Sequence, residues 1–129
     1  MDRSAVLNVN EVENRSPTER PPASLTTDRL LDTLANAHRR RVVRRLFERD
    51  APVPFERLVD DLATTQAAET GEADREAVRI ALHHTHLPKL VDDGVVTFDR
   101  EESIVEPGPQ LRVVAACLDA LERTRERVR

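Results

Sequence analysis

Several residue types on which common protein functions depend are scarce in this chain of 129 residues. The one cysteine, Cys117, cannot form an internal disulfide, and Trp and Tyr are missing. Only three Phe and three Gly occur, so Leu, Val, Ile and Ala must build the core, and little glycine is left for a catalytic or phosphate-binding loop. No Gly-x-Ser-x-Gly or His-Glu-x-x-His pattern occurs either. We therefore expect neither an enzyme nor a protein that carries a cofactor.

Long apolar runs are also missing. No stretch reaches the roughly 18 apolar residues that a transmembrane helix needs, and residues 1–20 lack the apolar centre of a signal peptide. We therefore expect a cytoplasmic protein without a membrane partner or a small-molecule substrate.

Residues 1–25 contain Pro17, Pro21 and Pro22 but no sustained apolar period, which predicts a disordered N-terminal tail.

Lysine is nearly absent from the basic residues. Lys89 is the only lysine among 20 basic side chains, whereas Asp and Glu together number 24 and the formal net charge is −4. Excess acid, arginine in place of lysine and few bulky apolar residues suggest a salt-adapted, GC-rich source, in which high net charge keeps a chain soluble. The same acidity means that any DNA-binding surface must be a local basic patch.

Apolar residues recur at helical spacing through most of the chain after residue 25, and turn-forming residues divide the pattern into segments. Two short β-rich runs near residue 100 are separated by a polar turn, which predicts a hairpin. The expected elements are a first helix capped within residues 26–28 and ending near Ala37, a helix over 38–48, a short strand at 53–54, a helix over 55–64, a linker over 65–73, a helix over 74–92, hairpin strands over 95–98 and 103–106, and a last helix over 110–128.

A proline interrupts the long helix predicted over residues 74–92. Pro88 removes one backbone hydrogen bond and crowds the preceding turn, so we expect a kink or a tightened turn between His84 and Leu87. Gly94 then ends this helix.

Two helices, a connection and a β-hairpin form the plan of a winged helix-turn-helix, a mainly α fold with a β-hairpin wing. The segment LDTLANAHRRRVV over residues 31–43 resembles the opening of ArsR-like winged-helix regulators, and HLPKLVDDGVV over 86–96 resembles the end of their recognition helix. Residues 85–90 with 94–96 and 98–99 are similar to small haloarchaeal winged-helix proteins of unassigned role. The resemblance implies a DNA-binding domain over residues 26–109 and archaeal, halophilic relatives.

The helix over residues 74–92 is the expected recognition helix, which would enter the major groove of double-stranded DNA. At about 100° per residue, Arg75, Arg79 and His86 share one face, and His83 flanks them. Arginine can bond to guanine or to a phosphate from such a face. Alternatively, both arginines only solvate the helix and pair with nearby carboxylates such as that of Glu76.

Other basic residues are candidates for contacts with the DNA backbone. Arg39, Arg40 and Arg41 begin a cluster of five arginines that could reach phosphates. Some of the five must instead pair with the acidic helix over residues 55–64, because they cannot all face one way. Arg100 is the only cation at the hairpin tip, whose acidic neighbours would repel a phosphate.

The histidines also allow a metal interpretation. His83 and His86 are spaced i, i+3, which can chelate a metal ion, but no Cys or carboxylate lies within one turn on that face. We therefore expect no metal site, and we expect Cys117 to pack as a small apolar residue.

The last helix, within residues 110–129, carries a narrow apolar seam. Leu111, Val114, Leu118 and Leu121 recur at steps of three and four residues, which is typical of a helix that pairs with a second copy. A homodimer would present two recognition helices about one DNA turn apart. Packing of the seam on its own domain is the alternative.

Two functions from different classes fit these observations. The first is a transcriptional regulator that binds double-stranded DNA in a sequence-specific manner. The second is a winged-helix module that binds a protein and not DNA, which the net negative charge and the acidic hairpin favour. A positive patch over residues 74–92 and 39–45 would favour the first function, and its absence would favour the second. A sensor of a small molecule is a third possibility, for which the sequence shows no site.

Overall fold

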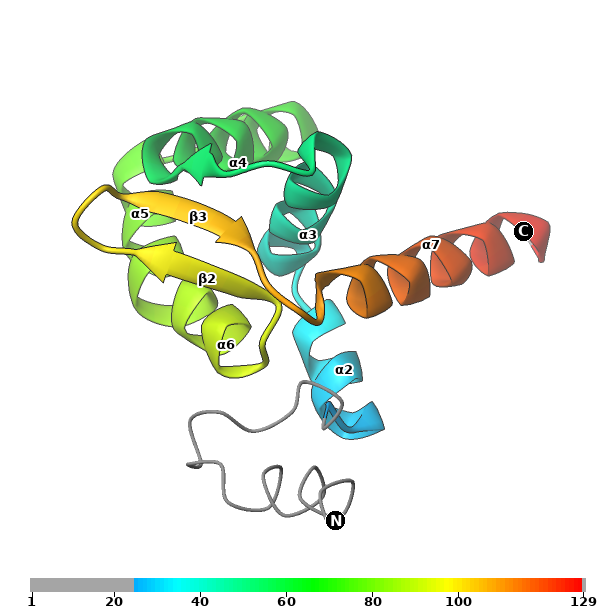
Figure 1. Ribbon diagram of the computed structural model, residues 1–129. Coiled ribbons are helices and arrows are strands. Elements are labelled where there is room, and N and C mark those ends of the chain that lie inside the picture. Colours follow the sequence, from blue (N-terminus) through cyan, green and yellow to red (C-terminus); the bar gives the residue numbers. More distant parts are fainter. Residues whose placement is uncertain (1–24, 129) are drawn as a thin grey trace, which may run out of the picture.

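The computed structural model describes residues 25–128, which form a helix-rich fold with one small antiparallel sheet (Figure 1). The predicted tail over residues 1–25 lies almost entirely outside the described part. Among residues 25–128, no helix is long and apolar enough to cross a membrane. In chain order the elements are α2 (Thr27–Leu34), α3 (Ala37–Arg49), β1 (Val53–Pro54), α4 (Phe55–Thr70), α5 (Arg75–Ala81), the π-helical turn η3 (Leu82–His86), α6 (Leu87–Asp92), β2 (Val96–Asp99), β3 (Ile104–Pro107) and α7 (Leu111–Arg127).

Three helices begin at polar residues that cap them. The side chains of Thr26, Asn36 and Asp74 each accept hydrogen bonds from backbone N–H groups in the first turn of α2, α3 and α5. These bonds satisfy donors that have no partner within the helix. The capping of the first and fourth predicted helices is therefore confirmed, and the expected break at Asn36 is the start of α3.

Helix α4 is longer than predicted. It continues through most of the expected linker over residues 65–73 and ends at Gly71, whose φ of 91° is the left-handed conformation of a helix C-cap. The added turns contain Gln66, Ala67 and Ala68, which favour a helix, and their polarity does not oppose one on an exposed surface. The linker prediction was therefore wrong, and only residues 71–74 connect α4 to α5.

The sheet has the strand order β1–β3–β2, with all neighbours antiparallel. Val105 of β3 pairs with Val53 on one side and Phe98 on the other. In the turn between β2 and β3, the carboxylate of Asp99 accepts the backbone N–H groups of Glu101 and Glu102 at 3.0 and 3.1 Å. The predicted hairpin is therefore present, and the short strand β1 widens it into a three-stranded sheet.

The core is almost entirely aliphatic. Leu46 of α3, Leu58 of α4, Leu82 of η3, Leu90 of α6 and Val105 of β3 are all 0% exposed. These residues join the helices to one face of the sheet in a single cluster. Leu and Val dominate the core, as the scarcity of aromatic residues requires.

The helix over residues 75–92 is continuous in space but changes its winding in the middle. The backbone N–H of Leu87 donates to the carbonyl of Leu82, five residues earlier, so η3 is a widened π turn. The distortion lies where Pro88 predicted it, but the turn is widened and not tightened. A wider turn moves the carbonyl of His84 away from the proline ring, which would otherwise clash with it. We call the whole segment α5–η3–α6 the broken helix.

A close backbone contact fixes the start of α7. A Cβ atom added at Gly108 would lie 2.5 Å from the carbonyl oxygen of Gly94, closer than a side-chain carbon can approach. The N–H of Gly108 donates to the carbonyl of Val95 at 2.8 Å, and the N–H of Gln110 donates to that of Gly94 at 2.9 Å. The segment before α7 is therefore tied to the loop that follows α6.

The apolar seam of α7 packs on its own domain for most of its length. Leu111, Val114 and Leu118 are 3, 0 and 3% exposed, so they do not form a free dimerisation face as predicted. Leu121 is 45% exposed, because the second half of α7 extends beyond the body of the molecule (Figure 1). The first half of the seam is therefore core, and Leu121 in the second half is only partly covered.

Candidate functional site

The two arginines of the predicted DNA-reading stripe lie on the exposed side of α5, beside α4. Arg75 donates through Nε to Asp60 at 2.8 Å and through Nη2 to Glu56 at 2.9 Å. Arg79 also bonds to Glu56, and its Nε donates to Glu76 at 3.1 Å. We call these five residues the ion-pair lattice.

The lattice follows from helical spacing. Glu56 and Asp60 are i, i+4 on α4, and Arg75 and Arg79 are i, i+4 on α5, so each pair projects from one face of its helix toward the other. Both arginines therefore lie opposite carboxylates, and each guanidinium is engaged before any ligand arrives. The structure therefore contains the alternative arrangement, in which these arginines pair with nearby carboxylates, including that of Glu76.

The charges within the lattice stabilise one another. Desolvation would raise the pKa of Glu56, but hydrogen bonds from Arg75 and Arg79 outweigh it and hold this pKa below its usual value. The hydrogen bond to Asp60 raises the pKa of Arg75, and the one to Glu56 raises the pKa of Arg79. All these groups are accessible to solvent, so the lattice is screened and each pair contributes little to stability.

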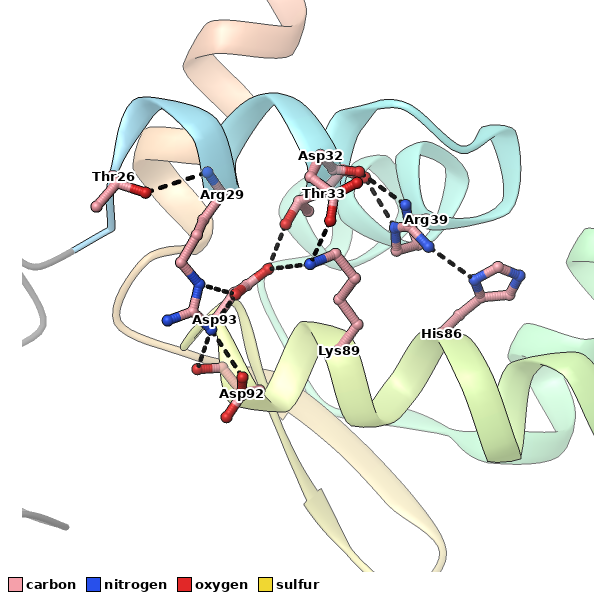
Figure 2. Close-up of polar contacts among 9 residues, drawn as sticks. All are labelled: Thr26, Arg29, Asp32, Thr33, Arg39, His86, Lys89, Asp92 and Asp93. Carbon is pink, nitrogen blue, oxygen red and sulfur yellow. Dashed lines mark hydrogen bonds and ion pairs between the residues drawn. The ribbon is translucent and has the colours of Figure 1, made fainter.

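Arg39 and His86 were predicted to touch DNA, but both are buried. Arg39 is 8% exposed and donates to the carbonyls of Thr33 at 3.0 Å and Asp32 at 2.7 Å, where α2 ends. Its Nη1 also lies 3.2 Å from Nδ1 of His86, which is 6% exposed (Figure 2). Both assignments to a DNA-contacting surface were therefore wrong.

The π turn explains the placement of His86. A helix of constant pitch puts residues 75, 79 and 86 on one face, but the extra residue in η3 offsets the later positions and turns His86 toward the core. Burial and, to a smaller extent, the neighbouring charge of Arg39 lower the pKa of His86 to about 4. The ring is therefore neutral near pH 7, and Nδ1 accepts a hydrogen bond from Arg39.

Three further members of the arginine cluster on α3 are also engaged. Arg40 donates to the carbonyl of Leu34 at 2.9 Å, and Arg41 pairs with Asp61 at 2.9 Å. Arg44 pairs with Glu122 of α7. These three residues therefore follow the alternative in which members of the cluster pair within the chain and not with DNA phosphates.

A second buried polar group was not predicted from the sequence. The carboxylate of Asp93, at the end of α6, is 0% exposed and bonds to Arg29 Nε at 2.9 Å and to the hydroxyl of Thr33 (Figure 2). Lys89 lies 3.5 Å from the same carboxylate and 2.8 Å from Asp32, and its hydrogen bond lowers the pKa of Asp32. These contacts fasten α2 to α6. The partners are about 60 residues apart in the chain, so no local pattern could reveal them.

Two adjoining hollows lie between the broken helix and the β2–β3 hairpin. The larger, of about 480 Å³, is lined by residues of α4, α5, η3, β2 and the hairpin turn, and the smaller, of about 300 Å³, by residues of η3, α6, β2 and the turn. His83, Phe98 and Arg100 line both hollows. We call the two hollows together the helix–hairpin groove.

The floor of the groove is aromatic and apolar. The ring centroid of His83 lies 5.8 Å from that of Phe55 and 6.3 Å from that of Phe98, both in edge-to-face arrangements. The guanidinium of Arg100 lies over the Phe98 ring, 6.0 Å from its centroid. Ile80, which also lines the larger hollow, is 51% exposed. Two of the three Phe residues in the chain therefore meet at this groove.

Among the predicted DNA contacts, the structure brings together Arg79, His83 and Arg100 at the larger hollow, and it separates His83 from His86. His86 points away from the groove into the contact with Arg39, so the two rings cannot share a metal ion. Within residues 25–128, no three His, Cys, Asp or Glu side chains are grouped so as to hold one.

The surroundings of the larger hollow are acidic. The ion-pair lattice and the hairpin turn together contribute six carboxylates and three guanidinium groups, which leaves a net charge of −3. We call these nine residues the acidic rim: Glu56, Asp60, Glu76, Asp99, Glu101 and Glu102 with Arg75, Arg79 and Arg100. Among these nine residues of the described surface, carboxylates therefore outnumber the cations that were expected to read DNA.

Comparison with known proteins yields one family. A family model described as a domain of unknown function, DUF7344, matches residues 31–106, from within α2 to within β3. The match includes the broken helix and the whole groove but not α7. No curated protein and no solved structure matches the chain.

Proposed function

The chain belongs to the DUF7344 family, and we propose that its domain is a winged helix that serves as a protein-interaction module. In this proposal α4 and the broken helix form the helix-turn-helix, and the β2–β3 hairpin is the wing. The partner protein binds in the helix–hairpin groove, at the place where a DNA-binding relative would offer free cations to a nucleic acid.

The observation that carries this proposal is the combination of an aromatic floor with an acidic rim. Duplex DNA is recruited by Lys and Arg that neutralise its phosphates, and the net charge of −3 around the groove opposes that step. Protein-binding surfaces, in contrast, are enriched in aromatic and arginine side chains around a central apolar anchor. Phe98, Arg100 and the half-exposed Ile80 provide such a surface.

Opening the ion-pair lattice would not turn it into a DNA site. Each exposed pair is worth only about 0–1 kcal/mol, so a phosphate could displace a carboxylate from Arg75 or Arg79. The displaced Glu56 and Asp60 would still lie beside the phosphate, and their repulsion would offset the gain.

A photo-crosslinking amino acid at position 80 tests the proposal. The same amino acid at position 113 is the control, because Ile80 and Val113 are 51 and 50% exposed and only Ile80 lines the groove. We expect a covalent protein adduct from position 80 in cells of the source organism and none from position 113. Equal adducts at both positions, or none at position 80, would contradict the proposal.

Sequence-specific DNA binding is the second candidate. The order of the elements in the chain and the broken helix beside a hairpin favour this candidate, because such an arrangement can place one helix in a major groove. If it holds, the full chain shifts labelled duplexes selected from genomic DNA, and Arg75→Ala with Arg79→Ala abolishes the shift without changing the circular dichroism spectrum.

A charge variant distinguishes the two candidates. Glu56→Gln with Asp60→Asn removes both carboxylates of α4 from the lattice and frees Arg75 and Arg79. For an interaction module we expect weak DNA binding by the native chain and clearly stronger binding by this variant. A native chain that already binds duplex DNA tightly, with an affinity that falls steeply as salt rises, would favour the DNA-binding candidate.

A further inference from the structure

We infer that the helix–hairpin groove accepts a positively charged protein segment that carries at least one apolar anchor side chain, an inference that rests on the protein-interaction function proposed above. Three features of the groove support this class of partner: its net charge, its unpaired carboxylates and its two-part floor. Each feature restricts the chemistry of the occupant in a different way.

The sign of the charge selects a cationic occupant. The acidic rim has a net charge of −3: Glu56, Glu76, Arg79 and Arg100 line the larger hollow, and the other five residues belong to the lattice and the hairpin turn beside it. At an ionic strength of about 0.15 M the screening length is about 8 Å, so charges beside a hollow of this size act together under those conditions. Acidic segments and nucleic acids would be repelled there, whereas Lys and Arg side chains would be attracted.

The hairpin turn supplies carboxylates that are still free to pair. Glu101 and Glu102 donate their backbone N–H groups to Asp99, but their exposed side chains form no ion pair with any residue of the described part. The carboxylates of the ion-pair lattice, in contrast, are already bonded to Arg75 and Arg79. A cationic partner therefore makes its new ion pairs mainly with the turn.

The floor selects an apolar anchor. Ile80 is half exposed beside the rings of His83 and Phe98, and these side chains gain most from a partner that excludes water from them. The Phe98 ring already lies beneath the guanidinium of Arg100, so its cation comes from within the chain and the partner supplies the apolar contact. A segment that alternates basic and apolar residues satisfies both the rim and the floor.

A phage-displayed library of random peptides, selected against the immobilised full chain, tests the inference. We expect enriched peptides to carry Lys or Arg around Leu, Ile, Met or Phe, and their affinity to fall as salt rises. Binding measured by anisotropy of the labelled peptides should weaken about tenfold in Ile80→Ala, a typical loss for a buried interface anchor. Val113→Ala, at an equally exposed position on α7, should leave binding unchanged.

A pair of charge reversals tests the role of the hairpin turn. Glu101→Lys with Glu102→Lys should reduce binding about tenfold or more, because it reverses two rim carboxylates that form no ion pair with the described residues. Glu48→Lys with Glu126→Lys changes the net charge of the chain equally at exposed positions outside the groove. Equal losses in the two double variants would overturn the inference, because they would reflect overall charge and not the groove.

The composition of the selected peptides separates the failure of this inference from the failure of the proposed function. Neutral or acidic peptides whose binding depends on Ile80 would overturn the preference for a cationic partner and leave the protein-interaction function in place. Selection of no peptide that depends on Ile80 would overturn both.

Discussion

Arg39 and His86 are 47 positions apart in the chain, yet the guanidinium of the first lies 3.2 Å from Nδ1 of the second inside the protein. The contact joins the first turn of α3 to the π turn of the broken helix. Because the same guanidinium also bonds to the last carbonyls of α2, three helices meet at one side chain (Figure 2). The contact requires a neutral imidazole, so its integrity depends on pH.

We predict that acidification destabilises the fold through His86. The pKa of His86 is about 4 in the folded chain and about 6.5 when the group is unperturbed. As pH falls from about 6.5 towards 4, the unfolded chain binds a proton that the folded chain refuses, so the free energy of unfolding decreases by on the order of 3 kcal/mol. Urea unfolding followed by far-UV circular dichroism measures this, since the chain has no Trp or Tyr for fluorescence.

The variant His86→Gln tests the origin of that pH dependence. Its amide oxygen can still accept a hydrogen bond from Arg39 but does not titrate, so stability should fall less between pH 6.5 and 4. His84→Gln, which removes an exposed imidazole on the same turn, should retain the native slope. An unchanged slope in His86→Gln would show that other groups cause the loss.

Adjacent carboxylates at the end of α6 provide a matched comparison of burial. Asp93→Ala should lower the free energy of unfolding by about 2–3 kcal/mol, because it leaves Arg29, Thr33 and Lys89 without a buried partner. Asp92→Ala removes a carboxylate that is 78% exposed and should cost less than about 1 kcal/mol. Similar losses in the two variants, measured by urea unfolding, would mean that the Asp93 network does not hold α2 in place.

The two halves of α7 should respond differently to the same truncation. Leu118→Ala removes a side chain that is 3% exposed and should cost about 2–4 kcal/mol. Leu121→Ala, at a position 45% exposed, should cost less than about 1 kcal/mol in an isolated chain. If the second half of α7 pairs with a second copy, as its apolar pattern predicts, Leu121→Ala should also shift sedimentation towards the monomer. Equal losses of stability in both variants would contradict this prediction, because they would mean that Leu121 is buried in a core that a single copy of the chain does not have.

Two glycines allow a test of the close backbone contact before α7. Gly108→Ala should destabilise the protein by about 2 kcal/mol or more, because the new methyl group would meet the backbone of Gly94 and Val95. Gly71→Ala meets nothing within 4 Å and should cost only about 1 kcal/mol through its left-handed φ of 91°. Thermal unfolding of the two variants gives the comparison, and a milder effect at Gly108 would mean that the segment can move aside.

Local chemistry made much of the fold predictable. Thr26, Asn36 and Asp74 mark helix starts or breaks by their side chains, and the alternation around Phe98 and Val105 indicates a hairpin. Each of these signals acts between residues close in the chain. The end of α4 was missed because its polar last turns resemble a linker, although Ala67 and Ala68 favour a helix.

The candidate site was less predictable because its properties arise between distant segments. Arg75 and Arg79 form a cationic stripe when α5 is considered alone, and only the packing of α4 beside it brings Glu56 and Asp60 to neutralise them. His86 was misplaced because the periodicity assumed an unbroken α-helix. The groove itself combines His83 of η3 with Phe98 of β2, a pairing that no spacing rule contains.

The junction of three helices depends on the widened winding of the π turn. If Leu82–His86 adopted ordinary α winding with all of its residues, every later side chain would turn by about 100°. Leu87 and Leu90 would then swing toward solvent, and His86 would leave Arg39. Deleting one exposed residue of this segment, such as Thr85, would remove the extra residue together with the wide turn, so the later side chains would keep their directions and the junction would survive.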